Sequence, residues 1–116
     1  MAKILIVDDQ RPFRKVLGLA LKSKGYDIRE AASGSDALAV MRKEAPDLIL
    51  ADWRMPGMNG LDLCRAIRAT SDVPIIMVTS KQDGQSEALS AGADDYIKKP
   101  FEVEDLLTRV ESALTK

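Results

Sequence analysis

The chain has 116 residues, of which 46% are hydrophobic and 30% charged, and this length and composition are typical of one globular domain. Its formal net charge of −1 provides no basic field for nucleic acid, so we do not expect this chain to bind DNA directly. Histidine is absent, which excludes the commonest general base and leaves carboxylates, hydroxyls and lysines for any chemistry.

Three short, unbroken apolar runs predict strands that are buried on both faces of a parallel sheet. They are residues 4–7, 48–51 and 75–78. Two weaker runs, residues 26–31 and 94–98, alternate polar with apolar side chains and suit the edges of that sheet. No signal-peptide pattern precedes the first run and no run is long enough to span a bilayer, so we expect a cytoplasmic protein without membrane contact.

Apolar residues at helical spacing predict two helices in the first third of the chain. The first helix has an apolar face formed by Phe13, Val16, Leu17 and Ala20. Gly25 is expected to end this helix. Ser33 and Asp36 have the spacing of a capping box, which predicts the start of the second helix.

Three further helices are predicted in the second half of the chain. Leu63, Cys64 and Ile67 support the third, in which Cys64, the single cysteine, is a small buried residue with no disulfide partner. Residues 83–91 have few large apolar side chains and predict the weakest and most mobile helix. The clearest apolar stripe marks the last helix: Val103, Leu106, Leu107, Val110 and Leu114.

Five strands alternating with five helices predict one α/β domain over residues 1–116, with a doubly wound parallel sheet and helices on both faces. If the unbroken runs are central and the two weaker runs are edges, the strand order 2-1-3-4-5 satisfies right-handed crossovers. The chain changes direction between strands 1 and 3, and ligands bind outside the carboxyl ends of strands at such a point. Asp8, Asp9 and Asp52 are therefore expected to converge there.

Functional groups follow the first, third, fourth and fifth strands and suggest phosphoryl chemistry. Three carboxylates in one crevice repel each other and would either take up protons or recruit a cation, and oxygen ligands favour Mg²⁺. Lys99 and Thr79 supply an ammonium and a hydroxyl for the oxygens of a transferring phosphoryl group. Because histidine and a P-loop pattern are both absent, a carboxylate nucleophile is the plausible acceptor, and Asp52 is the best candidate.

The same residues resemble the receiver domain of two-component response regulators, the CheY-like family. The resemblance covers the whole chain in order and rests on Asp8-Asp9, residues 52–60 (DWRMPGMNG), Thr79-Ser80 and residues 91–101 (AGADDYIKKPF). The strand order 2-1-3-4-5 is known for a chemotaxis member of this family, so it is not independent of the resemblance.

The resemblance implies a role for each group. Asp52 would take a phosphoryl group from a phosphohistidine on a sensor histidine kinase or a phosphotransfer protein. Lys99 would pair with the phosphoryl oxygens, and its bond to Pro100 is expected to be cis. The resemblance also implies that Mg²⁺ is bound by Asp8, Asp9, Asp52 and the backbone carbonyl of Arg54. Asp8 would bind the ion partly through water.

Thr79 and Tyr96 are the switch residues that the resemblance implies. Thr79 would move to bond the phosphoryl group, which lets Tyr96 move inward and changes the surface of residues 83–91, 94–98 and 103–114. A downstream protein target or an output domain would read that surface, and homodimerisation through it is an alternative use.

Three positions differ among family members and are expected to modulate the site. Ser80 replaces the alanine that is common beside the switch hydroxyl, where Thr79 must move. The resemblance implies that Arg54 and Lys81 border the path of the hydrolytic water. Two interpretations of these cations stay open: they shield or contact the phosphoryl group, or they are solvated loop charges.

Two other functions are less consistent with these residues. A phosphatase of the haloacid dehalogenase type needs an Asp-x-Asp segment after its first strand, and residues 7–10 (VDDQ) lack that spacing. A phosphorylation-independent interaction module usually has an eroded acidic site, whereas every key position is filled here. We therefore expect a phosphoacceptor that catalyses only its own phosphotransfer and dephosphorylation, and not an enzyme acting on an external substrate.

Overall fold

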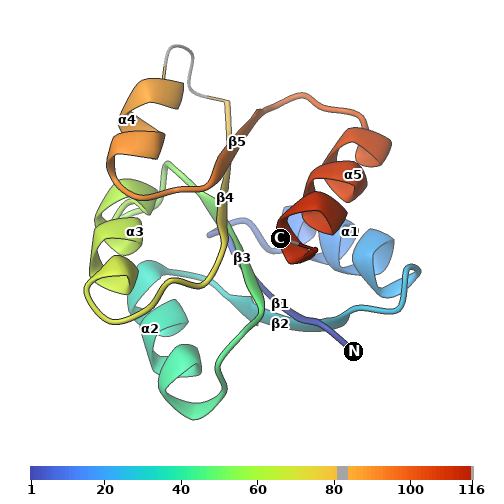
Figure 1. Ribbon diagram of the computed structural model, residues 1–116, viewed down its shortest axis with the longest axis horizontal. Helices are drawn as coiled ribbons and strands as arrows, with labels where there is room; N and C mark the ends of the chain where they lie inside the picture. Colours follow the sequence, from blue (N-terminus) through green and yellow to red (C-terminus); the bar gives the residue numbers. More distant parts are fainter. Residues whose placement is uncertain (81–83, 116) are drawn as a thin grey trace.

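Strands and helices alternate strictly through residues 1–80 and 84–115, the part of the chain that this computed structural model describes (Figure 1). The strands are β1 (Lys3–Val7), β2 (Asp27–Ala31), β3 (Leu48–Asp52), β4 (Ile75–Thr79) and β5 (Asp95–Lys98). The helices are α1 (Arg11–Lys22), α2 (Gly34–Lys43), α3 (Gly60–Arg68), α4 (Gln85–Ser90) and α5 (Val103–Leu114). All strands pair in parallel in the order β2-β1-β3-β4-β5, so the predicted doubly wound α/β fold and its strand order are confirmed.

Helices cover both faces of the sheet. Figure 1 shows α2, α3 and α4 on one face and α1 and α5 on the other. Because successive side chains of a strand point to opposite faces, β1 supplies Leu5 and Val7 to one core and Ile4 and Ile6 to the other. The central runs are therefore unbroken apolar sequence, since each of their residues is buried on one side or the other.

The predicted apolar face of α1 is partly wrong. Leu17 and Leu21 are buried and Phe13 packs against the same core, so the buried stripe follows an i, i+4 spacing. Val16 was predicted to lie on this face, but its side chain is 59% exposed and lies with Leu19 on the solvent side. Burial of Phe13, Leu17 and Leu21 rotates the helix so that Val16 cannot also reach the sheet.

The structure contains the capping residue and the glycine that the sequence predicts at helix ends. The Ser33 hydroxyl accepts a hydrogen bond of 3.1 Å from the backbone N–H of Asp36, as the capping-box spacing predicts. Gly25, just beyond α1, has a φ of +91°, a conformation that favours glycine. The Asn59 side chain caps α3 by accepting from the N–H of Asp62 at 2.9 Å.

Helix α4 is the shortest of the described helices, with six residues, of which only Ala88 is buried. This agrees with the weak apolar pattern of that segment, and its greater mobility stays a prediction. The predicted helix began at residue 83, which lies outside the described residues.

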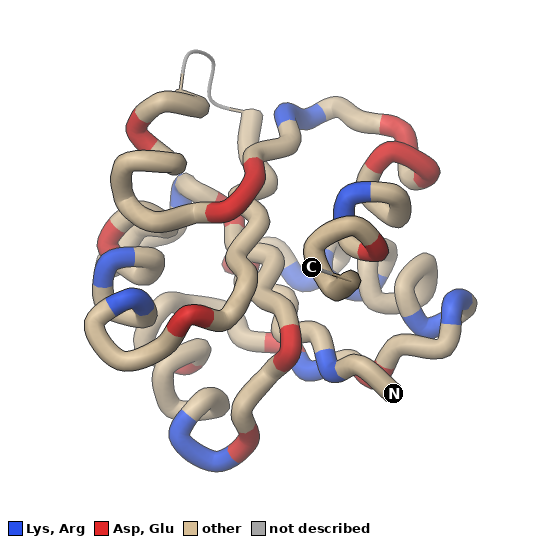
Figure 2. Tube along the Cα trace, viewed as in Figure 1, with Lys and Arg blue, Asp and Glu red and all other residues tan. Residues whose placement is uncertain are grey.

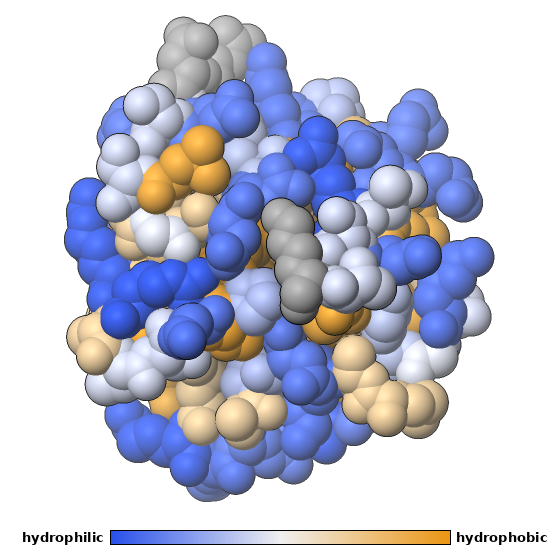
Figure 3. Space-filling view, in the orientation of Figure 1, coloured by the Kyte–Doolittle hydropathy of each residue, from blue (hydrophilic) through white to orange (hydrophobic). Residues whose placement is uncertain are grey.

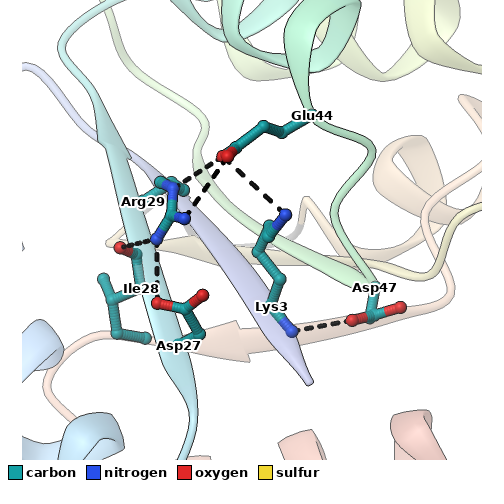
Figure 4. Close-up of polar contacts among 6 residues, drawn as sticks. All are labelled: Lys3, Asp27, Ile28, Arg29, Glu44 and Asp47. Carbon is teal, nitrogen blue, oxygen red and sulfur yellow. Dashed lines mark hydrogen bonds and ion pairs between the residues drawn. The ribbon is translucent and has the colours of Figure 1, made fainter. Parts of the chain in front are cut away.

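An ion-pair network ties the edge strand β2 to β1 and to the end of α2 (Figure 4). The Arg29 guanidinium donates to Glu44 at 2.6 Å and to Asp27 at 2.8 Å, and the Lys3 ammonium lies 3.8 Å from Glu44. The Lys3 backbone N–H donates to the Asp47 carboxylate at 2.7 Å. These contacts lie at the amino ends of the strands.

Residues near both ends of the chain lie at that same end of the sheet. Met1 and Ala2 border a hollow of about 470 Å³ together with Ala113 and Leu114 of the last helix. Asp47 and Pro74, just before β3 and β4, line the same hollow.

The surface carries both charge signs over helices and loops rather than one basic face (Figure 2). The side shown in Figure 3 is mostly hydrophilic, with an apolar patch over α4, where the Leu89 side chain is 44% exposed. Within the described ranges, no helix is both long enough and apolar enough to cross a membrane.

Candidate functional site

Asp8 lies immediately after β1 and is almost completely buried, with 1% of its surface exposed. One of its carboxylate oxygens accepts from the backbone N–H of Gln10 at 2.8 Å, and the Arg14 guanidinium donates to the Asp8 carbonyl at 2.7 Å. These bonds fix the turn that follows the strand. Asp9 comes next in the chain and is exposed.

Asp52 ends β3, the neighbour of β1, so parallel pairing brings the acidic groups together. Oxygen atoms of Asp8, Asp9 and Asp52 all lie within 4.8 Å of one another. The sequence-based expectation that these three carboxylates converge is thus confirmed.

The Lys99 ammonium reaches into this cluster from beyond β5. It lies 3.5 Å from an oxygen of Asp8 and 3.8 Å from an oxygen of Asp52. Its backbone N–H donates to the Thr79 carbonyl at 2.8 Å, which continues the pairing of β4 with β5. The bond between Lys99 and Pro100 is cis, as expected.

Burial raises the pKa of Asp52 above its ordinary value. The Lys99 ammonium opposes this by lowering the pKa, whereas the Asp8 carboxylate raises it further. Hydrogen bonds from the backbone amides of Trp53 and Arg54 lower it slightly. The three carboxylates of this cluster carry two more negative charges than the Lys99 ammonium can balance. All the atoms that could bind a metal ion are carboxylate oxygens, which are hard ligands. A divalent cation of the Mg²⁺ type fits this arrangement.

The predicted switch residues lie in β4 and β5. Thr79 is fully buried at the end of β4, one residue beyond Val78, which pairs with Asp52 across the sheet. Tyr96 is half-buried in β5, and its backbone carbonyl accepts from the Arg109 guanidinium at 3.1 Å. Thr79 therefore lies at the acidic edge of the sheet, while Tyr96 lies nearer the middle of β5.

Two of the three residues predicted to modulate the site, Arg54 and Ser80, are exposed. Arg54 lines a hollow of about 460 Å³ with its neighbours Trp53, Met55, Pro56 and Asn59. Lys81 lies outside the described residues.

The structure adds two residues that the sequence interpretation did not assign to the site. Phe13 was predicted only as part of a core face, but its ring lies beneath the Lys99 ammonium, 3.9 Å from nitrogen to ring centroid. Gly60 was quoted only as part of a motif. A Cβ atom at Gly60 would collide with the backbone carbonyl of Asp52 and approach Trp53 Cα to 2.9 Å.

Comparison with known proteins identifies the family. The family described as the response regulator receiver domain matches residues 4–111. The chain belongs to this family. The resemblance that the sequence motifs indicate is therefore confirmed, and this chain is a receiver domain of the two-component response regulators.

Curated relatives of this receiver domain are longer proteins. The DNA-binding response regulator MtrA of Mycolicibacterium smegmatis is 43% identical over 116 residues, covering 98% of this chain and 51% of MtrA. The phosphate regulon transcriptional regulatory protein PhoB of Pseudomonas aeruginosa is also 43% identical, covering 97% of this chain and 52% of PhoB. The chain thus spans about half the length of these relatives.

Solved structures match the receiver domain over nearly its full length. A response regulator from Chloroflexus aurantiacus superposes with a TM-score of 0.94 at 38% identity, covering 99% of this chain and 98% of the other. The chemotaxis protein CheY4 of Vibrio cholerae gives a TM-score of 0.92 at 35% identity, covering 98% of this chain and 99% of CheY4.

Proposed function

We propose that this receiver domain accepts a phosphoryl group on Asp52 and acts as a signalling switch. The observation that carries the proposal is the convergence of three carboxylates with an ammonium 3.8 Å from the Asp52 carboxylate. The carboxylates supply a nucleophile and metal ligands, and Lys99 supplies a positive charge beside them. No external substrate is needed for this use of the site.

The chemical step is an in-line displacement at phosphorus. An Asp52 carboxylate oxygen forms a bond to phosphorus while the phosphorus–nitrogen bond of a donor phosphohistidine breaks, and the electron pair stays on the imidazole nitrogen. The Lys99 ammonium helps keep Asp52 anionic against its burial and lies where it can pair with a phosphoryl oxygen. Later attack of water on phosphorus breaks the bond to Asp52 and releases inorganic phosphate.

The acidic cluster fits Mg²⁺, and the residues that would hold it are Asp8, Asp9, Asp52 and the backbone carbonyl of Arg54. When bound, Mg²⁺ supplies positive charge that neutralises the phosphoryl oxygens. Asp8, fixed through its bonds to Gln10 and Arg14, gives that ligand set a rigid member.

The conformational response to phosphorylation begins at the buried hydroxyl of Thr79. We infer that Thr79 moves toward the phosphoryl group, that Tyr96 then moves inward, and that the surface of α4, β5 and α5 changes. Ser80 and the cations Arg54 and Lys81 tune how long the phosphoryl group survives.

The partners follow from this role. The donor is a sensor histidine kinase or a phosphotransfer protein in the cytoplasm. The reader of the changed surface is a downstream protein or an output domain, because the curated relatives are about twice the length of this chain. Homodimerisation through α4, β5 and α5 is a further use of the same surface, and this receiver domain itself makes no contact with nucleic acid.

Intact-mass spectrometry with Mg²⁺ and acetyl phosphate tests the proposal. We expect one phosphoryl adduct on the wild type, none on Asp52→Asn and none after metal chelation. Asp72→Asn is the matched control, because Asp72 is exposed and precedes β4 at the opposite end of the sheet, so this variant should form the adduct. A wild type without adduct, under conditions faster than hydrolysis, would favour a phosphorylation-independent interaction module instead.

A further inference from the structure

The contacts between the Lys99 ammonium and the carboxylates are long. Its distances of 3.5 Å to Asp8 and 3.8 Å to Asp52 exceed the 2.7–2.9 Å or so of a short charge-assisted hydrogen bond. A lysine side chain has four flexible carbon–carbon links and leaves a crevice readily. The carboxylates alone therefore do not fix where the ammonium lies.

An aromatic ring provides a third attachment. The Lys99 nitrogen lies 3.9 Å from the centroid of the Phe13 ring, well within the range of about 6 Å in which the face of a ring attracts a cation. Phe13 comes from the first turn of α1, so this contact joins α1 to the residue that follows β5. It is also independent of the charge state of the carboxylates.

The Phe13 ring is half-buried in the core of the α1–α5 layer, which limits its movement. Phe101 contacts it in a T-shaped arrangement, with centroids 6.4 Å apart and an interplanar angle of 80°. Both rings pack against the core between the sheet and the α1–α5 layer. Phe13 therefore presents its face to Lys99 from a fixed, half-buried position.

We propose that Phe13 is a positioning residue for phosphotransfer, whose ring face holds the Lys99 ammonium beside Asp52. This proposal rests on the proposed acceptance of a phosphoryl group by Asp52. Attraction to the ring face holds the cation without engaging it with another oxygen, so its N–H groups stay available to the incoming phosphoryl group. An aliphatic residue at position 13 would fill much of the same space but would not attract the cation.

A fluorination series tests this without altering the shape of the core. Phenylalanine carrying one, two or three ring fluorines at position 13 weakens the electrostatic attraction stepwise while the side chain stays nearly isosteric. We expect the rate of adduct formation with acetyl phosphate and Mg²⁺ to fall with each fluorine. Phe13→Leu should be roughly five- to tenfold slower than wild type, and Phe13→Tyr should be close to wild type.

Phe101→Leu is the matched control, since it makes the same change in the neighbouring ring but leaves the ring beneath Lys99. We expect its rate to stay within about twofold of wild type. An equal loss in Phe101→Leu and Phe13→Leu, or no trend along the fluorine series, would overturn the proposal, because packing alone would then explain the result.

A second readout needs neither metal nor phosphodonor. Protons on Lys99 Cε should be shifted upfield by the ring current of Phe13 in the NMR spectrum of the metal-free protein. We expect this shift to vanish in Phe13→Leu and to persist in Phe13→Tyr and Phe101→Leu, and an unchanged Lys99 signal in Phe13→Leu would contradict the contact. If the shift behaves as expected but the wild type forms no adduct, phosphoryl acceptance fails, and the positioning role fails with it.

Discussion

Asp52 carries its charge in surroundings that oppose it. Burial and the Asp8 carboxylate raise its pKa, and Lys99 only partly offsets them. We predict that Asp52→Asn stabilises the metal-free protein at neutral pH, by on the order of 1 kcal/mol, because it removes a like-charge repulsion and a desolvation penalty. Urea unfolding of both proteins measures the difference.

The pH dependence of that gain has a defined sign. A carboxyl group whose pKa is higher in the folded than in the unfolded protein destabilises the folded state, and this penalty is complete at a pH above the folded pKa. The penalty decreases as the pH falls through the folded pKa, and it is absent below the unfolded pKa. The advantage of Asp52→Asn should therefore shrink between neutral pH and about pH 4. A gain that is constant across this range, or an equal gain in the exposed control Asp72→Asn, would contradict the assignment.

Gly60 is required because the chain passes close to the Asp52 backbone. An added Cβ would collide with the Asp52 carbonyl and lie 2.6 Å from Met77 Cε. Gly60→Ala should therefore destabilise the protein by about 1–3 kcal/mol and slow formation of the phosphoryl adduct. Thermal unfolding and mass spectrometry report the two effects.

The same change from glycine to alanine should have the opposite effect on stability at Gly18. A Cβ there would meet only Ile28 Cγ2, at an ordinary 3.8 Å, inside helix α1. Gly18→Ala should stabilise the protein by about 0.5–1 kcal/mol, because alanine favours a helix interior. If both variants were destabilised equally, the close approach at Gly60 would not be the cause.

At the scale of elements, Arg29 joins the edge strand β2 to the end of α2. Its guanidinium, through side-chain hydrogen bonds, holds the pKa values of Asp27 and Glu44 below their ordinary range. We predict that Arg29→Met returns both pKa values toward normal, as measured by NMR titration of the carboxyl carbons.

The stability change from Arg29→Met should be small, because the pairs are exposed and screened by salt. Lowered carboxyl pKa values stabilise the fold above the unfolded pKa, and this contribution is lost as pH falls through the folded pKa. The wild type and Arg29→Met should thus converge in thermal stability at low pH or high salt. A difference that persists in both conditions would indicate lost packing of the side chain instead.

The element scale also shows what the sequence can and cannot predict. Unbroken apolar runs reveal strands buried on both faces, so β1, β3 and β4 were predictable from periodicity. The rotation of α1 was not, because Val16 and Leu17 are equally apolar and only packing on the sheet decides which is buried. Phe13 was missed for the same reason, since helical spacing places it on the core face but does not place the Lys99 ammonium above it.

At the scale of the whole molecule, cation binding should stabilise the entire fold. The acidic residues come from two neighbouring strand ends, so a bound ion favours the folded state over the unfolded chain. Mg²⁺ at tenfold above its dissociation constant should add about 1.4 kcal/mol of stability, and a chelator should reverse the gain. Thermal scans across a Mg²⁺ series at constant ionic strength measure it. The same gain in Asp9→Asn would show that the ion acts elsewhere.

Strand direction made the location of the acidic cluster predictable, because the ends of parallel strands share one edge of the sheet. It has a second consequence at the opposite edge, where Met1 and Ala2 lie beside Ala113 and Leu114. A dye, a tether or a solid support attached at Met1 is kept away from Asp52 by the length of a five-residue strand, about 16 Å. A short linker that joins the segment after Leu114 to Met1 should likewise give circular permutants in which the acidic edge is unaltered.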